Sequence, residues 1–365
     1  MDMMYVEECC EILDSMRVPI TASDREEGEY PYYGANGIQD YVADYIFDDE
    51  LVLLAEDGGN FGSKERPIAY RVSGKCWVNN HAHVLKPKAG LDVDYLCYSL
   101  MFYKVDGMVN GATRQKLTQA AMRKMKIPSR SMNEQLHIVD ELNRILKIKE
   151  QRQQELTLLD NLIKARFFEL FGDPMINPKG FPVKTIEEVS VLNKGITYSP
   201  EDVADEGMIV LRSSNIKGNV FDLEDLVKIT KKISPDKYVQ ENDILMCNRN
   251  GSARLVGKVA MIPKLDENMT FGTFMTTVRS DIYEYLFAFF QMDAFREQIK
   301  FQTAVAINQI SLPLLASVKV PVPPRELIDE FAAFTKQIDK SKVAVQKALD
   351  ETQVLFDSLM QKYFG

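Results

Sequence analysis

Two long stretches of the chain place apolar residues at alternating spacings of four and three. The first runs from Asn133 to Phe171 without Pro or Gly, and it puts Ile138 and Leu142 on one stripe ahead of a polar gap. The second begins at Glu326 and repeats the pattern. This spacing predicts two long helices with coiled-coil-like seams, and the first would be roughly 60 Å long at about 1.5 Å per residue.

Each predicted helix has a stripe that is too apolar to face water, so we expect the two stripes to pack together as an antiparallel coiled coil. The alternative is that each helix packs on its own globule or on another protein. The side chains that we predict to pair the helices are Ile138, Leu142, Leu156, Leu159, Ile163, Phe331, Phe334, Ile338, Val345, Leu355 and Leu359.

The rest of the chain consists of short β-rich runs separated by Gly-Gly, Asn-Gly and Ser-Gly turn signals. Shorter helices are expected near 92–104 and 117–124, and a further helical run from Tyr283 to Phe301. This combination of β-rich runs and helices predicts an α+β protein. Its four segments are a mixed α/β domain at 1–130, a central long helix at 131–172, a second similar domain at 173–323 and a C-terminal long helix at 324–365.

The two halves match each other at a nearly constant offset of 193 residues. "LVLLAEDGG" at 51–59 falls on "ILMCNRNGS" at 244–252, with Gly58 over Gly251. "KLTQAAMRKMKIP" at 116–128 falls on "QISLPLLASVKVP" at 309–321, and both long helices end on Phe-Gly. A period this long indicates a tandem duplication of a domain plus its helix, and hence a pseudo-twofold internal repeat.

Composition is that of an ordinary soluble protein, with 45% hydrophobic and 27% charged residues over 365 positions. This length is enough for two domains with separate cores. No apolar run reaches membrane-spanning length, and the acidic start is unlike a signal or transit peptide. Five scattered cysteines without a CxxC pair favour reduced thiols and a cytoplasmic location.

Charge is distributed unevenly along the chain. The net charge of −9 at first argues against a nucleic-acid partner. However, residues 1–57 hold sixteen acidic residues and two arginines, whereas residues 58–130 hold thirteen Lys and Arg against four acids. Basic residues on turns beside Asn, Ser and Gln suit the phosphates and base edges of duplex DNA.

Polar turn residues are more often merely solvated, but their recurrence at matching places in both halves favours a shared role in contacting DNA. The predicted contacts of the first domain are Tyr33, Asn36, Lys64, Arg66, Asn79, Arg114 and Lys116. Those of the second domain are Arg212, Ser214, Asn215, Asn248, Arg249, Asn250 and Arg254.

The sequence contains no recognisable catalytic or cofactor motif. There is no Walker A loop and no GxGxxG after a strand. "FGDPMINP" lacks the second Pro and the aromatic residue of an adenine methyltransferase box, and it marks the end of a helix. His81-x-His83 has the spacing of metal ligands but no supporting cluster. We therefore expect one of these His residues to be buried in a hydrogen bond, the other to be exposed, and no metal to be bound.

The whole chain resembles the specificity subunit of type I restriction-modification systems. The resemblance rests on two β-rich domains, each followed by "KIP…NEQLHIV" or "VPVPPRELIDEF" and a long helix. It also rests on "LFGDPMINPKGFP" and on the turn phrases "LRSSNIKG", "YPYYGANGI" and "DILMCNRNG". "NEQLHIV" departs from the commoner "EEQ" form, and "KIPSRSM" lacks the second proline pair.

The resemblance implies two target recognition domains, each reading one half of a bipartite DNA site. The paired helices would act as a ruler and dock two methyltransferase (modification) subunits, and restriction subunits would add translocation and cleavage. S-adenosylmethionine, ATP and Mg²⁺ would then belong to the partner subunits. This chain would hold no cofactor and no catalytic residue.

Three alternatives remain open at this point. The chain could serve a methyltransferase–nuclease fusion system, or it could be a stand-alone sequence-specific DNA-binding protein. It could also be an enzyme, such as a nuclease, whose site has no recognisable motif.

Overall fold

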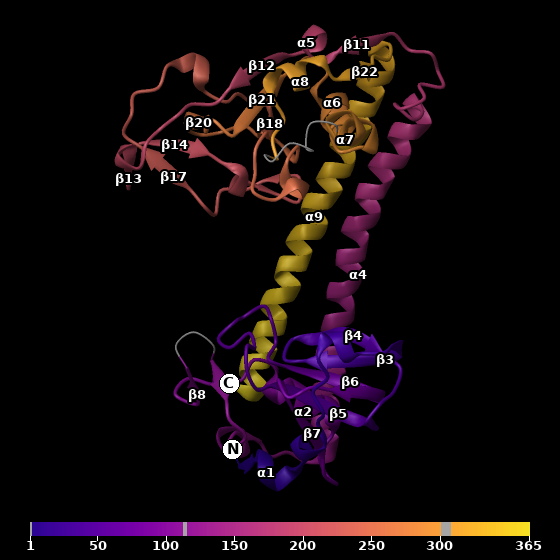
Figure 1. The fold of residues 1–365 in the computed structure, drawn as a ribbon, viewed down its shortest axis with the longest axis vertical. Helices are drawn as coiled ribbons and strands as arrows, with labels where there is room; N and C mark the ends of the chain where they lie inside the picture. Colours follow the sequence, from indigo (N-terminus) through magenta and orange to yellow (C-terminus); the bar gives the residue numbers. More distant parts are fainter. Residues whose placement is uncertain (1, 112–114, 301–307) are drawn as a thin grey trace. The chain divides into compact units, whose positions relative to one another are not determined.

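The computed structural model describes residues 2–111, 115–300 and 308–365 (Figure 1). The chain divides into two compact units. The first comprises Met1–Gln154 and Gln346–Gly365, and the second comprises Glu155–Val345. The long helices α4 (Met132–Phe171) and α9 (Arg325–Phe364) each contribute one part to each unit.

The first unit is built on a six-stranded sheet of order β2-β7-β5-β6-β3-β4, antiparallel except for the β3–β6 pair. Separate antiparallel pairs join β1 to β10 and β8 to β9. Besides the parts of α4 and α9, its elements are β1 Met3–Tyr5, α1 Val6–Cys9, β2 Cys10–Ile12, β3 Glu27–Gly34, β4 Gly37–Val42, β5 Phe47–Ala55, β6 Ala69–Val78, β7 Ala82–Pro87, α2 Val93–Met101, β8 Val109–Asn110, β9 Lys116–Leu117, α3 Gln119–Arg123 and β10 Lys126–Pro128.

Strand β5 is the centre of the first core. Its Val52 and Leu54 face one apolar cluster, together with α2 and the beginning of α4, whereas Leu51 and Leu53 face another. Alternate side chains of a strand point to opposite faces, so a continuous apolar run is expected where both faces are covered. The loop that follows β5 therefore starts from the buried end of the strand, residues 51–55.

The second unit contains two four-stranded sheets, ordered β12-β21-β18-β19 and β13-β17-β14-β20. Antiparallel pairs join β11 to β22 and β15 to β16. Besides the parts of α4 and α9, its elements are β11 Val183–Thr185, α5 Ile186–Val189, β12 Val191–Lys194, β13 Val203–Ala204, β14 Met208–Leu211, β15 Ile216–Lys217, β16 Val220–Phe221, β17 Val227–Ile229, β18 Ile244–Cys247, β19 Val259–Met261, β20 Met269–Phe271, β21 Met275–Arg279, α6 Tyr283–Phe289, α7 Asp293–Lys300, α8 Leu312–Ser317 and β22 Lys319–Pro321.

The helical run expected after Tyr283 is divided into α6 and α7. The break lets Phe289, Phe290 and Phe295 pack together, with ring centroids 4.9–6.1 Å apart. Burial of three aromatic rings in one cluster outweighs the continuity of a single helix.

The duplication is visible in matching elements of the two halves. Strand β1 pairs with β10 through Met3 and Pro128, and β11 pairs with β22 through Val183 and Pro321. The Tyr95 hydroxyl donates to the Pro128 carbonyl at 3.0 Å, and the Tyr285 hydroxyl donates to the Pro321 carbonyl at 2.5 Å. Helices α4 and α9 are each 40 residues long. The predicted fold class, with its internal repeat and two long helices, is confirmed.

Within each unit the parts of α4 and α9 run antiparallel, because residue numbers rise along α4 while those of their partners fall along α9. The polar contacts pair Glu141 with Tyr363 and Lys149 with Gln353 in the first unit, and Asp160 with Lys342 and Arg166 with Glu330 in the second.

Most side chains predicted to pair the helices are at least partly buried. Leu355 is the exception, at 46% exposed, and its neighbour Phe356 is buried against the first core instead. The buried members of the predicted set are Ile138, Leu142, Phe331, Ile338 and Val345, and the half-buried ones are Leu156, Leu159, Ile163, Phe334 and Leu359.

At the end of each helix pair, an aromatic ring of one long helix packs against a tyrosine ring of a shorter helix. In the first unit the Phe364 ring of α9 lies 5.3 Å from the Tyr95 ring of α2. In the second unit the Phe171 ring of α4 lies 4.9 Å from the Tyr285 ring of α6. Each repeat therefore supplies the final aromatic residue of its long helix to the core built on the other repeat.

Candidate nucleic-acid interface

The loop after β5 is fastened by main-chain atoms. The N–H groups of Glu56 and Asp57 point at the His81 carbonyl, at 2.9 and 3.5 Å. The Glu56 carbonyl in turn accepts the N–H of Leu117 at 2.7 Å. The loop is thus held between the turn before β7 and the segment that contains β9.

The loop after β18 in the second unit is fastened in the same way. The N–H groups of Asn248 and Arg249 point at the Phe274 carbonyl, at 2.8 and 3.3 Å. The Asn248 carbonyl accepts the N–H of Ile310 at 2.8 Å. We call this set of hydrogen bonds, in either unit, the main-chain frame.

The matching hydrogen bonds of the two main-chain frames make Glu56 equivalent to Asn248 and His81 equivalent to Phe274. Gly58 then falls on Asn250, because their N–H groups bond to the equivalent carbonyls of Gln115 and Asn308 at 3.2 and 3.3 Å. The sequence comparison placed Gly58 on Gly251. The one-residue difference arises because the second unit has one more residue between the loop and the turn that holds it.

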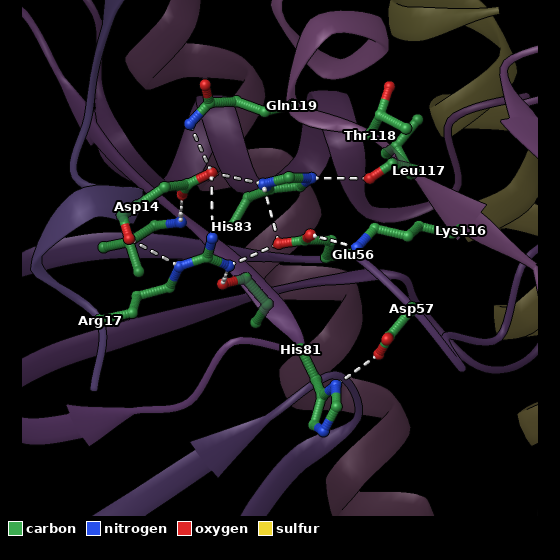
Figure 2. A network of polar contacts seen from close by, with 12 residues as sticks. Asp14, Arg17, Glu56, Asp57, His81, His83, Lys116, Leu117, Thr118 and Gln119 are labelled. Carbon is green, nitrogen blue, oxygen red and sulfur yellow. Dashed lines mark hydrogen bonds and ion pairs between the residues drawn. The ribbon is translucent and has the colours of Figure 1, made fainter. Parts of the chain in front are cut away.

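A buried polar network lies beneath the first frame (Figure 2). One oxygen of Asp14 contacts Nδ1 of His83 at 2.7 Å and accepts from Gln119 at 2.9 Å, and the other accepts the N–H of Val84. Nε2 of His83 lies 2.9 Å from the Leu117 carbonyl, which can only accept. Both ring nitrogens thus have polar partners, and His83 links the network to the segment that contains β9.

Cations balance the carboxylates of this network. Arg17 donates to Glu56 at 2.6 Å, and the Lys116 ammonium lies 3.0 Å from the other Glu56 oxygen. Burial alone would raise the pKa of Asp14 and of Glu56. Hydrogen bonds and charge from His83, Arg17 and Lys116 outweigh burial, and both pKa values lie below their ordinary range.

Asp14, Glu56 and His83 bring three potential ligand atoms within 4.8 Å of one another, yet the residues around them do not fit a metal ion. The Arg17 guanidinium already lies 2.6 Å from Glu56 and 3.5 Å from Asp14. A divalent ion would have to displace this cation and the proton on His83. The expectation that one His is buried in hydrogen bonds is confirmed by His83, whereas the other, His81, is half-buried and not exposed as expected.

The predicted contacts of the first domain differ in accessibility. Asn36, Lys64, Arg66 and Lys116 are exposed, Tyr33 is half-buried, Asn79 is buried, and Arg114 lies outside the described residues. The Asn36 amide donates to the Gly58 carbonyl at 3.0 Å. Asn79 donates to Gln39 and accepts the N–H of His81, so its side chain holds the turn that carries His81.

The predicted contacts of the second domain also vary. Arg249 and Arg254 are exposed, Arg212, Ser214 and Asn250 are half-buried, and Asn215 and Asn248 are buried. The Asn215 amide donates to the carbonyls of Asp222 and Asp225, and its oxygen accepts the N–H of Arg212. Asn215 therefore shapes the turn after β14, and its contact with DNA stays a prediction.

The turn after β14 meets the second frame through two polar side chains. Asn250 donates to Ser213 at 3.2 Å, and Lys258 donates to the carbonyls of Ser213 and Ile216. Burial lowers the pKa of Lys258. Lys258 was not among the predicted residues, because a Lys that ties carbonyls together has no distinctive sequence pattern.

Two ring side chains that were not predicted to contact DNA lie at the frames. His81 contacts Asp57 at 2.6 Å between Nδ1 and Oδ1 (Figure 2). Phe274 is 52% exposed, and the Arg249 guanidinium lies 5.0 Å from the centre of its ring. An aromatic residue in the turn "FGTFMTT" was the available signal for Phe274.

The long helices expose apolar side chains on both α4 and α9. The exposed residues are Met132, Leu136, Ile148, Leu158, Leu162 and Phe168 of α4, and Val343, Val354 and Leu355 of α9.

Comparison with known proteins gives one family. A family model described as "Type I restriction modification DNA specificity domain" matches residues 1–158 and 178–352. A Haemophilus influenzae protein, whose name describes it as a type I restriction enzyme specificity subunit, is 34% identical over 175 residues, which are 47% of this chain and 45% of the relative. The Escherichia coli EcoKI specificity subunit is 26% identical over 47% of this chain and 39% of its own length. The chain thus matches less than half the length of these curated relatives.

A solved structure has the same overall fold. The type I restriction-modification S subunit from M. genitalium aligns with 100% of this chain and 96% of its own, with a TM-score of 0.57 and 15% sequence identity. At 15% sequence identity this similarity establishes the fold alone, and the function has to be argued from the site.

Proposed function

Because the chain belongs to the family of the type I restriction modification DNA specificity domain, we propose that it is the DNA sequence-specificity subunit of a type I restriction-modification complex. Its two target recognition domains, at 1–130 and 173–323, each read one half of a bipartite duplex site. The helices at 131–172 and 324–365 set the distance between the half-sites and dock two methyltransferase subunits.

The recurrence of the main-chain frame with different side chains is the observation that supports this proposal best. Equivalent backbone positions carry Glu56 in one domain and Asn248 in the other, and likewise Asp57 and Arg249. One scaffold that presents different polar groups suits two readers of two different short sequences.

Exposed cations near the frames supply affinity for the duplex. Lys64 and Arg66 follow the first loop, and Arg249 and Arg254 lie in and after the second. Cations that meet phosphates bind any sequence, whereas contacts with base edges discriminate. Each mismatched base pair costs about 1–3 kcal/mol, so two joined readers discriminate far better than one.

The chemistry is assigned to partner subunits. Cations already neutralise the carboxylates of the buried network, which leaves that network as a support rather than a catalytic centre. S-adenosylmethionine belongs to the two methyltransferase subunits, and ATP and Mg²⁺ belong to the restriction subunits. The apolar side chains exposed along α4 and α9 suit the docking of the methyltransferases.

A cytoplasmic location follows from this assignment. No helix among the described residues is long and apolar enough to cross a membrane. The five cysteines, Cys9, Cys10, Cys76, Cys97 and Cys247, are buried free thiols, as expected in a reducing compartment.

The test is to assemble the chain with the methyltransferase encoded beside it and to map methylated adenines on genomic DNA. We expect one bipartite motif with a fixed gap, and we expect no methylation by the chain alone. Unaided methylation, or cleavage of plasmid by the chain with Mg²⁺, would refute the non-catalytic role.

The purified chain and its neighbouring genes also distinguish the alternative functions. Tight sequence-specific binding by the chain without a methyltransferase would favour a stand-alone DNA-binding protein. A neighbouring gene that encodes methyltransferase and nuclease in one polypeptide would favour a fusion system.

A further inference from the structure

We propose that His81 with Asp57, and Phe274 with Arg249, are the equivalent base-reading pairs of the two domains, and that their different chemistry makes the two half-sites different. This inference rests on the proposed DNA-reading function and adds to it the residues and the base classes concerned. Of these four residues, only Arg249 was predicted from the sequence to contact DNA.

The main-chain frame places the two pairs at the same position. His81 and Phe274 each accept two consecutive loop N–H groups through their carbonyls. In both domains the second of these N–H groups belongs to the partner of the pair, Asp57 or Arg249. The side chains then meet across this shared backbone, as an ion pair in one domain and as a cation–π contact in the other.

The fastening is done by carbonyl oxygens, which every residue type provides. The rings of His81 and Phe274 are therefore not needed to hold the loop. The Phe274 ring is 52% exposed and the His81 side chain is 33% exposed. A ring that is partly exposed, beside a charged partner and on a rigid backbone, is suited to contact a ligand that arrives from solvent.

The second pair has the chemistry for a guanine beside a thymine. An arginine donates two hydrogen bonds to O6 and N7 of guanine in the major groove, and an aromatic ring contacts the thymine methyl group. Stacking on Phe274 limits the orientations of the Arg249 guanidinium, which lowers the entropy cost of binding.

The first pair has the chemistry for a cytosine. A carboxylate accepts a hydrogen bond from the cytosine amino group. The contact from His81 Nδ1 fixes the orientation of Asp57 (Figure 2). Asn79 supports the pair from below by accepting the N–H of His81 at 2.8 Å.

The buried layer beneath each pair is matched in position as well. Strand pairing places His83 opposite Leu54 in the first domain and Thr276 opposite Met246 in the second. His83 faces Glu56, and Thr276 accepts from Asn248, which is the frame equivalent of Glu56. The polar contact beneath the first pair is therefore between His83 and Glu56, and the one beneath the second pair is between Thr276 and Asn248.

The experiment uses the complete chain assembled with its methyltransferase, and duplex pools in which one half-site is randomised. Phe274→Ala is expected to lose the preference at one thymine of the second half-site and to leave the first half-site unchanged. Replacing that thymine with uracil removes only the methyl group. It should weaken wild-type binding about fourfold and leave Phe274→Ala binding unchanged.

The first pair is tested by Asp57→Asn. Asparagine prefers adenine, to which it can make two hydrogen bonds, so the preferred base at one position of the first half-site should change from cytosine to adenine. His81→Ala should relax the same position without changing its preferred base.

His137→Ala on α4 and Val203→Ala on β13 are matched controls at exposed positions of the same units, and neither should change the motif. Thermal melting establishes that each variant folds. An unchanged motif in folded Phe274→Ala and Asp57→Asn, or equal weakening of all sequences, would overturn the inference. A wild-type complex without a bipartite motif would instead refute the proposed function.

Discussion

Arg249 is the residue for which exposure and geometry make the simplest test of base reading. Arg249→Ala should relax preference at one base of the second half-site by about 10- to 100-fold, because a bidentate contact to guanine discriminates by about 1–3 kcal/mol. Mapping of methylated adenines measures the change. Arg325→Ala, at an exposed arginine of α9, is the control. Uniform weakening on all sequences would show a phosphate contact instead.

Asp14 is the residue on which the first unit's buried network depends. Asp14→Asn weakens the contact with His83 and leaves a buried cation with a poorer partner, so we expect a loss of about 3 kcal/mol in the free energy of unfolding. Trp77, the single tryptophan, lies in this unit and reports its unfolding by fluorescence in urea. A loss below about 1 kcal/mol would contradict the dependence of the network on Asp14.

The same network predicts an acid-sensitive first unit. The folded pKa values of Asp14 and Glu56 are lowered, so their stabilisation is fully present above the unfolded values, which lie near about 4. It is lost as pH falls through the folded values. The urea midpoint of the Trp77 transition should therefore fall below about pH 4, and Asp14→Asn should show a shallower fall. Equal slopes for both proteins would contradict this assignment.

Contacts of this kind are beyond sequence reasoning at the residue scale. One of the two His residues was expected to be buried in a hydrogen bond, but the pattern did not say which, and the partner of His83, Asp14, is 69 positions away in the chain. Asn79 and Asn215 have the same composition signal as exposed polar turn residues, yet the Asn79 amide donates to Gln39 of β4 and the Asn215 amide donates to the Asp222 carbonyl. Burial of a polar side chain depends on tertiary packing, which a local pattern does not contain.

At the scale of elements, α9 offers a direct comparison of adjacent side chains. Phe356 is buried in the first core, whereas Leu355 is 46% exposed. Phe356→Ala should cost about 3–5 kcal/mol of unfolding free energy, and Leu355→Ala less than about 1 kcal/mol. Urea unfolding followed by Trp77 fluorescence measures both. A larger loss of unfolding free energy for Leu355→Ala than for Phe356→Ala would instead support the helix-pairing role predicted for Leu355 from the sequence.

The helices were the elements that sequence predicted best. Their 4-3 apolar stripes and the lack of Pro and Gly identified α4 and α9 almost to their ends, and α2 and α3 lie within the expected ranges. The seam departs at Leu355 because the end of α9 enters the first core, where α2 and α4 both contact it. Sheet order was not predictable, since strand pairing joins segments without a shared local pattern.

For the whole molecule, the exchange of helix ends predicts how a half-chain behaves. Residues 1–172 contain α4 but lack the part of α9 that packs in the first unit. We expect this fragment to dimerise, because Phe171 of a second copy can take the place of Phe364 beside Tyr95. Light scattering measures its mass.

Phe171→Ala in the fragment should weaken the dimer at least tenfold, since burial of one large aromatic side chain is worth more than about 1.4 kcal/mol. Leu162→Ala, at an exposed position, is the control. With methyltransferase, the wild-type fragment should read a symmetric site made of the first half-site twice. A monomeric fragment would contradict helix pairing as the basis of assembly.

The use of carbonyl oxygens to fasten each loop has an evolutionary consequence. Under the proposed base reading, substitutions at the positions of His81, Asp57, Phe274 and Arg249 leave the loop anchored, so single codon changes alter the recognised bases without loss of folding. Because the two domains are fastened independently, each half of the target can drift by itself. If the proposed function holds, a host lineage could acquire a new methylation signature, and a new barrier to foreign DNA, through very few mutations.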